Sequence, residues 1–233
     1  MVYGETGHFP ASMYIQVSLI KYWLRIISLP DSRINKKLYS VVYMLNKNGL
    51  CDSKWIDFVR TSLLRNGFGY VWYNQGNGLN IECFKEDFKE RLHREFVQEW
   101  RSFLNESPKC LLYREIKQEF GLESYMYKLP MQLLPFLIKF RTSNHKLEIE
   151  RGRYNNIERS ERICKMCSLN VLGDEYHLLF ECLNEKIVML RKKFLSKNLL
   201  KNSSMYKLVN LFTYFDEKVY VNLCKFLKFS DVI

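Results

Sequence analysis

Apolar side chains recur at helical spacing along most of the chain. Residues 13–29 carry such a stripe and are followed by Pro30, which stops a helix. The same periodicity predicts helices over residues 33–48 and 54–66, each ended by an asparagine or glycine signal. Short loops separate these segments, so the first part of the chain is predicted to be a helical array.

The aromatic and glycine-rich segment 68–78 interrupts this pattern and is predicted to be a short strand or an ordered loop. Residues 83–104 then form the clearest amphipathic helix of the chain, with one apolar stripe opposite a charged face. Such a stripe is the ordinary signal of a helix that faces a core. The stripe consists of Phe84, Phe88, Leu92, Phe96, Trp100 and Phe103.

Helical periodicity continues in residues 109–121, 185–200 and 205–229. The predicted fold class is therefore mainly α: a helical array with a small Cys-Cys-His-Cys zinc knuckle and at most one short β hairpin or strand. We expect two regions: a helical region over residues 1–128, and a basic helical region over residues 129–233 that contains the knuckle.

The composition excludes two broad classes of protein. Hydrophobic residues make up 47% of the chain and aromatic residues 15%, more apolar material than disordered chains contain. The most apolar window, residues 13–29, includes Lys21 and Arg25 and falls short of the about 20 uncharged residues of a transmembrane helix. The N-terminal residues lack the layout of a signal peptide. We therefore expect an intracellular protein, nuclear or cytoplasmic, with no membrane contact.

The net charge of the chain indicates what kind of partner it binds. The chain has 36 Lys and Arg residues against 25 Asp and Glu, a net charge of +11. A basic domain of this kind typically binds polyanions, because each cation placed near a phosphate releases counterions. The charge therefore favours RNA or DNA as partner. The alternative is a basic, solvated surface without a partner.

Three cysteines and one histidine lie within a short stretch, at the spacing Cys164-x2-Cys167-x9-His177-x4-Cys182. Thiolates and imidazole are the usual ligands of Zn²⁺, and a Cys3His set closes a tetrahedral structural site. Because a closed shell leaves no position for water, we expect one structural Zn²⁺ ion that folds the chain and does not catalyse. The alternative is small buried thiols and one hydrogen-bonded histidine that serve only packing.

Basic residues flank this cluster on both sides. Residues 139–167 hold eight basic and four acidic side chains, and residues 186–201 hold six basic and no acidic ones. These segments are candidates for phosphate contacts, and Tyr154 is a candidate for base stacking. The predicted nucleic-acid contacts are Lys139, Arg141, Lys146, Arg151, Arg153, Tyr154, Arg159, Arg162, Lys165, Arg191, Lys192 and Lys193.

The stretch "FRTSNHKLEIERGRY", followed by "ERICKMCSLNVLGDEYHLLFEC", resembles the C-terminal region of reverse transcriptases from animal non-LTR (LINE-type) retrotransposons. The resemblance is strongest over residues 140–182 and extends upstream through "MVYGETGHFP", "LIKYWLRI" and "GFGYVWYNQG". It implies zinc at the four predicted ligands and contact with element RNA or target DNA nearby. A polymerase core or a host protein is a further partner that it suggests for the N-terminal helices.

The chain departs from that family at the point of catalysis. A polymerase palm needs paired aspartates to hold Mg²⁺, and no Asp-Asp pair occurs here. We therefore expect no enzyme, but a zinc-stabilised nucleic-acid-binding module without polymerase activity. The rival hypothesis is a structural or protein-interaction domain, a relic or domesticated fragment with no nucleic-acid role. An independent enzyme has no acid–base set or phosphate loop to support it.

Overall fold

Helices follow the predicted hydrophobic stripes in the computed structural model, which describes residues 1–233. No sheet forms, and the β structure is limited to two isolated bridges, Thr6–Leu122 and Ile163–Leu172. The mainly α fold class is therefore confirmed. None of the helices combines the length and the apolar character needed to cross a membrane.

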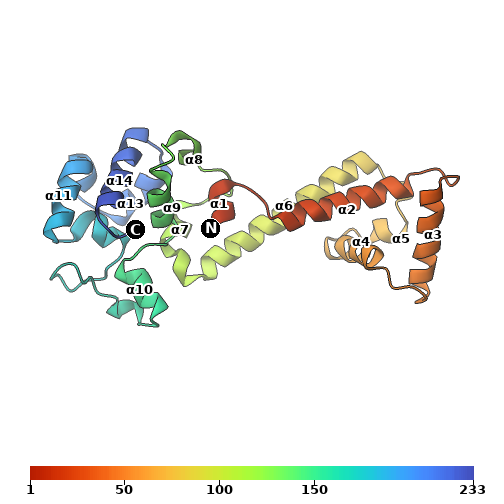
Figure 1. Cartoon of the computed structure of the whole chain (residues 1–233), viewed down its shortest axis with the longest axis horizontal. Helices are drawn as coiled ribbons and strands as arrows, with labels where there is room; N and C mark the ends of the chain where they lie inside the picture. The colour runs from red at the N-terminus through yellow and green to blue at the C-terminus, as the bar shows by residue number, and fades with distance from the viewer. The chain divides into compact units, whose positions relative to one another are not determined.

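The chain forms two compact units (Figure 1). Unit 1 contains residues 1–8 and 100–233, and unit 2 contains residues 9–99. The long helix α6 (Ile81–Glu106) runs from the end of unit 2 into unit 1.

This division differs from the regions 1–128 and 129–233 expected from the sequence. The N-terminal residues belong to unit 1 because Glu5 is buried in an ion pair with Arg141. Gly4 also lets the indole of Trp100 approach closely, since a Cβ atom at this position would lie 2.7 Å from the ring.

Unit 2 is built from helices packed around an aromatic core. The indole Nε1 of Trp23 donates a hydrogen bond of 2.9 Å to the Tyr39 hydroxyl, which in turn donates to Gln75 Oε1 at 2.5 Å. These bonds satisfy the polar atoms that large aromatic side chains bring into a core. The helices of unit 2 are α2 (Ala11–Ile27), α3 (Ile34–Lys47), α4 (Lys54–Arg65), α5 (Gly69–Tyr73) and the first part of α6.

The segment 68–78 was expected to be a strand or a loop, but its first half is helix α5. Val71 and Trp72 are buried in the core of unit 2, so tertiary packing decides the backbone conformation. The glycines Gly76 and Gly78 follow with φ angles of 72° and 74°, and they end the helical turn.

The apolar stripe of α6 serves both units. Phe84, Phe88 and Leu92 are buried in the core of unit 2, as predicted. Trp100 is buried as well, but it belongs to unit 1. Phe103 was also expected to be buried in a core, but this prediction is wrong: the residue is 55% exposed.

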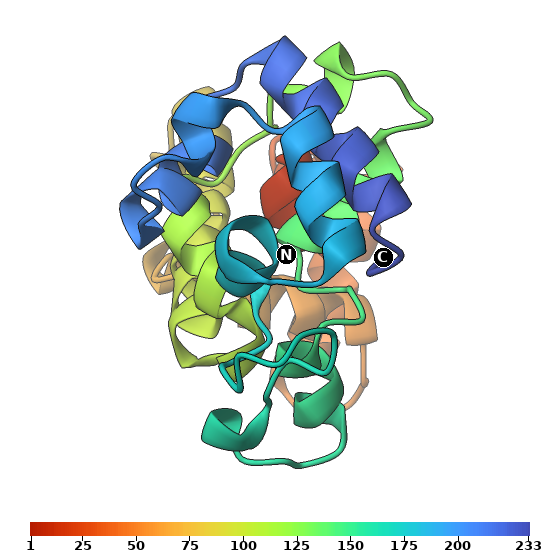
Figure 2. The same cartoon turned by 90° about the vertical axis from the view of Figure 1, so that its left-hand side faces the viewer.

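Unit 1 has a second core, in which α14 packs against both α9 and α11. Figure 2 shows the loops that carry the cysteine cluster at one end of this unit, next to α10. The elements of unit 1 are α1 (Val2–Thr6), the end of α6, η1 (Pro108–Cys110), α7 (Leu111–Ile116), α8 (Tyr125–Lys128), α9 (Leu134–Arg141), α10 (Glu148–Tyr154), η2 (Arg159–Glu161), η3 (His177–Glu181), α11 (Glu185–Phe194), α12 (Lys197–Leu200), α13 (Met205–Thr213) and α14 (Glu217–Phe229).

Candidate metal centre and its basic surroundings

A short antiparallel turn places the first predicted ligand. The backbone N–H of Cys164 donates to the carbonyl of Val171 at 2.9 Å, and that of Gly173 donates to the carbonyl of Arg162 at 2.9 Å. Gly173 permits this approach, because a Cβ atom there would lie 3.0 Å from the Cα atom of Cys164. These bonds form the isolated bridge between Ile163 and Leu172.

A capped turn places His177 and Cys182. Asp174 Oδ1 accepts a hydrogen bond of 2.8 Å from the backbone N–H of His177, so it caps the turn. The turn η3 is a π-helix, in which the N–H of Cys182 donates to the carbonyl of His177 at 2.8 Å. Single π turns are frequent at functional sites. Here the wider turn brings Cys182 to the side of the imidazole.

The four predicted ligands converge. The sulfur atoms of Cys164, Cys167 and Cys182 and a ring nitrogen of His177 all lie within 4.8 Å of one another. Three of the residues are buried and Cys167 is half-buried. The cluster can therefore hold a metal ion.

The imidazole is oriented for that task. Its Nε2 atom faces the cluster, 3.3 Å from Cys167 Sγ, while Nδ1 lies 3.5 Å from Glu181 Oε2 without forming a hydrogen bond. In metal sites the nitrogen away from the ion usually donates its proton to a carboxylate or carbonyl. His177 thus presents one nitrogen to the thiols and the other to an acidic neighbour.

The thiols differ in acidity. Burial raises the pKa of Cys167, but backbone N–H groups of Leu169 and Leu183 donate to its sulfur and bring this pKa down to about 6. Burial, together with the neighbouring sulfurs, raises the pKa of Cys182 to about 12. One thiolate is therefore preformed at neutral pH, whereas Cys182 keeps its proton until a cation replaces it.

Arg191 lies behind the cluster and not on a nucleic-acid surface, which corrects the sequence prediction. Its side chain is buried, with 7% of the residue exposed, and Nη1 donates to the carbonyl of Phe180 at 2.5 Å. Burial lowers the pKa of Arg191, while its electrostatic interaction with the sulfurs of Cys182 and Cys167 opposes this effect. Its Nε and Nη2 atoms are buried without hydrogen-bond partners. The guanidinium is therefore buried within electrostatic range of two of the four predicted ligands.

The prediction for Arg141 is also corrected by the structure. It was predicted to contact nucleic acid, but it is completely buried. Its Nη2 atom lies 3.3 Å from Glu5 Oε1 and 3.5 Å from Glu123 Oε2, and Nη1 donates to the carbonyl of Phe212 at 3.0 Å. These partners leave no donor available for a phosphate.

Two further residues that were predicted to contact nucleic acid are half-buried and already bind groups of the protein. Arg162 donates to the carbonyls of Ile157 and Ile149 at 3.0 and 3.1 Å, across Gly152, where a Cβ atom would lie 2.4 Å from the arginine side chain. Arg153 pairs with Glu150 at 2.9 Å. The exposed members of the predicted set are Lys139, Lys146, Arg151, Tyr154, Arg159, Lys165, Lys192 and Lys193.

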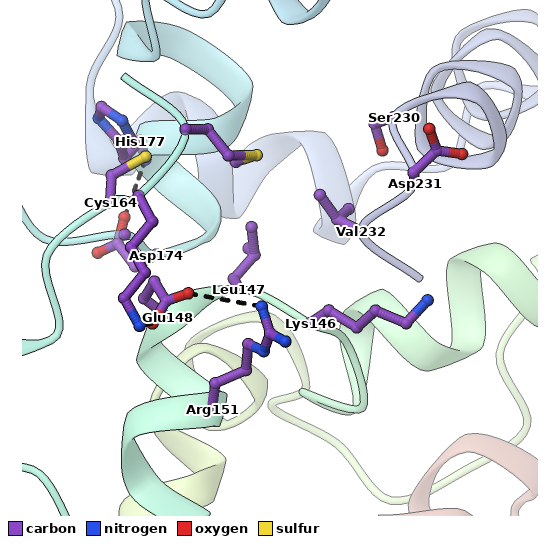
Figure 3. A pocket seen from close by; sticks show the side chains of 13 residues that line it. Lys146, Leu147, Glu148, Arg151, Cys164, Asp174, His177, Ser230, Asp231 and Val232 are labelled. Atoms are coloured by element: carbon purple, nitrogen blue, oxygen red, sulfur yellow. Dashed lines mark hydrogen bonds and ion pairs between the residues drawn. The ribbon is translucent and has the colours of Figure 1, made fainter. Parts of the chain in front are cut away.

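A cavity of about 250 Å³ opens beside the cluster (Figure 3). Leu147 and Glu148 line it from the start of α10, and Val232 lines it from the C-terminal segment. This cavity could not be predicted from the sequence, since its walls come from segments far apart in the chain. The buried pair of His145 Nε2 and Glu175 Oε1, 2.9 Å apart, was missed for the same reason.

Comparison of the chain with protein-family models, with curated proteins and with solved structures finds no match.

Proposed function

We propose that the chain is a nucleic-acid-binding module held in shape by one structural Zn²⁺ ion. The observation that carries the proposal is the combination of a closed Cys3His cluster with exposed cations on the elements around it. Zinc is the metal that this donor set favours, because three thiolates and one imidazole suit a tetrahedral ion without open positions. The residues that would hold it are Cys164, Cys167, His177 and Cys182.

The surrounding charge supports RNA or DNA as the partner. Lys139, Lys192 and Lys193 are exposed and form no ion pair with an acidic side chain. Three thiolates and one Zn²⁺ carry a net charge of −1, which the buried Arg191 offsets. These three exposed lysines are therefore not needed to neutralise the charge of the cluster and are available to bind phosphates.

The resemblance to the C-terminal region of a LINE-type reverse transcriptase suggests the biological setting of this module. On that reading it contacts element RNA or target DNA and has no polymerase activity of its own. Extension of a primed template by the pure chain with nucleotides and Mg²⁺ would overturn this part of the proposal.

The test of nucleic-acid binding is a titration of the zinc-loaded chain with a labelled oligonucleotide at several salt concentrations. With about six phosphates neutralised, the affinity should fall by roughly a thousandfold between about 50 and 200 mM salt. An affinity that does not change with salt would contradict the proposal.

A second candidate function is protein interaction through unit 2. Helix α3 exposes Ile34, Leu38 and Val41, which are 65%, 57% and 57% exposed and lie at heptad spacing along one face. Sedimentation of the chain at increasing concentration tests this candidate. A concentration-dependent association that Leu38→Glu abolishes would favour it.

A further inference from the structure

We propose that the cavity beside the metal centre receives one unpaired base of a nucleic-acid strand. This inference rests on the proposed nucleic-acid binding and adds to it the place where a base is held and the kind of base that fits.

The cavity is separate from the space that a metal ion would fill. Cys164 and His177 line it, but Cys167 and Cys182 do not. An ion held by all four ligands lies among four donor atoms, so it would sit behind the cavity wall. Figure 3 shows Cys164 and His177 on one side of the opening and Ser230, Asp231 and Val232 on the other.

The size of the cavity favours a single ring system. Its volume of about 250 Å³ lies below the range of about 300–1,000 Å³ that drug-sized ligands occupy. Leu147, Met166 and Val232 supply apolar walls. Such walls suit the flat faces of a base, and a methionine sulfur makes favourable contacts with aromatic rings.

Three cations line the cavity together with these walls: Lys146, Arg151 and Lys165. Lys165 and Arg151 pair with Glu148, but their side chains are 74% and 62% exposed, so they can turn from that carboxylate toward a phosphate. A phosphate on either side of an inserted base would replace the carbonyl of Ile233 that Lys146 Nζ contacts at 3.2 Å.

The acidic groups of the cavity are mostly occupied. Asp174 caps the turn of His177, and Asp231 pairs with Lys186. Glu148 is also paired, but with exposed side chains that a ligand can displace. Its two carboxylate oxygens lie 3.0 Å from Lys165 Nζ and 3.7 Å from Arg151 Nη1, and its side chain faces the cavity (Figure 3).

Glu148 therefore defines the kind of base. A carboxylate accepts a hydrogen bond from the exocyclic amine of cytosine or adenine, and it repels the carbonyl oxygen that uracil and thymine present at the same position. The base that the cavity favours carries an exocyclic amine.

The experiment compares a single strand with a duplex of equal length, about 12 nucleotides, on the zinc-loaded full chain. Val232→Trp should fill the cavity, because Val232 lines it. It should weaken binding of oligo(C) by about tenfold, the effect of losing one stacked base, and leave duplex binding unchanged. Phe229→Trp is the control, because Phe229 is 48% exposed and does not line the cavity.

Equal binding of oligo(C) by Val232→Trp and by the wild type would overturn the cavity proposal and leave the proposed function intact. Failure of the wild type to bind any strand or duplex would instead overturn the proposed function. Equal affinity of the wild type for oligo(C) and oligo(U) would overturn the role given to Glu148.

A surface variant covers the case in which Val232→Trp does not fold. Lys165→Gln should weaken oligo(C) binding several-fold more than duplex binding, because Lys165 lies at the cavity. Lys192 is exposed on α11 and does not line the cavity, so Lys192→Gln should weaken oligo(C) binding and duplex binding equally. Identical behaviour of the two variants would count against the cavity.

Discussion

The Nε2 atom of His177 lies 3.3 Å from the Sγ atom of Cys167. A tetrahedral zinc ion with bonds of about 2.3 Å to sulfur and about 2.0 Å to nitrogen holds such a pair about 3.5 Å apart. The chain therefore places imidazole and thiol close to the separation that zinc requires. Because a metal ion would tie together four ligands from one short stretch of loops and turns, the stability of the cluster should depend on metal.

Cys182→Ser should remove the metal and destabilise unit 1. Loss of one direct ligand should lower zinc affinity by more than about a hundredfold, since even loss of an indirect partner costs 10–100-fold. Zinc per chain by elemental analysis and thermal unfolding measure both effects. Cys224→Ser is the matched control, because Cys224 is completely buried but lies outside the cluster. Equal zinc content in the two variants would contradict the assignment of ligands.

Zinc affinity should rise with pH. The pKa of Cys182 is raised to about 12 by burial and by the adjacent sulfurs, so near pH 7 this thiol is protonated and zinc must displace the proton. Cys167, whose pKa is about 6, is already ionised and adds little to the slope above pH 7. The apparent affinity should therefore increase by at least about tenfold per pH unit between about pH 7 and 9. Competition with a chelator at several pH values measures the slope, and a flat response would contradict it.

The four candidate metal ligands could be predicted because they lie close together in the sequence. The spacing of four residues within one short stretch limits where their side chains can go, and the cap from Asp174 is also a short-range signal. The strong stripes of α2, α3 and α4 were predictable for the same reason, since each face repeats over several turns.

The burial of individual charged residues could not be predicted from the sequence. Arg141 is one basic residue among many in its segment, and its partner Glu5 is 136 positions away in the chain. Arg191 is buried, donates to the carbonyl of Phe180 and interacts with the sulfurs of Cys182 and Cys167, and no charge pattern in the sequence identifies these partners. Segment 68–78 shows the same limit, because burial of Val71 and Trp72 in a core fixes a helix where their local preference favours a strand.

Arg191→Met should weaken zinc binding by about 10–100-fold while the fold persists, because methionine fills similar space without offsetting the charge of the thiolates. Lys192→Met changes the next residue, which is exposed, and should leave zinc affinity unchanged. Chelator competition compares the two variants. Equal affinities would show that the buried guanidinium has no electrostatic role at the cluster.

Glu5→Ala should destabilise unit 1 strongly. The substitution leaves Arg141 buried with one of its carboxylate partners gone, and it removes the acceptor of the Tyr125 hydroxyl. Breaking a buried pair from one side costs about 3–5 kcal/mol. Glu82→Ala breaks the exposed pair with Lys85, 2.7 Å apart, and should cost no more than about 0.5 kcal/mol. Chemical denaturation measures both, and similar small losses would contradict a structural role for the buried pair.

Lys192→Gln combined with Lys193→Gln should flatten the salt dependence of nucleic-acid binding. Both side chains are exposed at the end of α11, and neither pairs with an acid. If each neutralises one phosphate, the slope of log affinity against log salt should become less negative by about 1.4 on a single strand and about 1.8 on a duplex. Lys85→Gln on α6, where the lysine is paired with Glu82, serves as the control and should leave the slope unchanged. An unchanged slope in the double variant would place the phosphates elsewhere on the protein, because two lysines that touch the backbone cannot be lost without releasing fewer counterions.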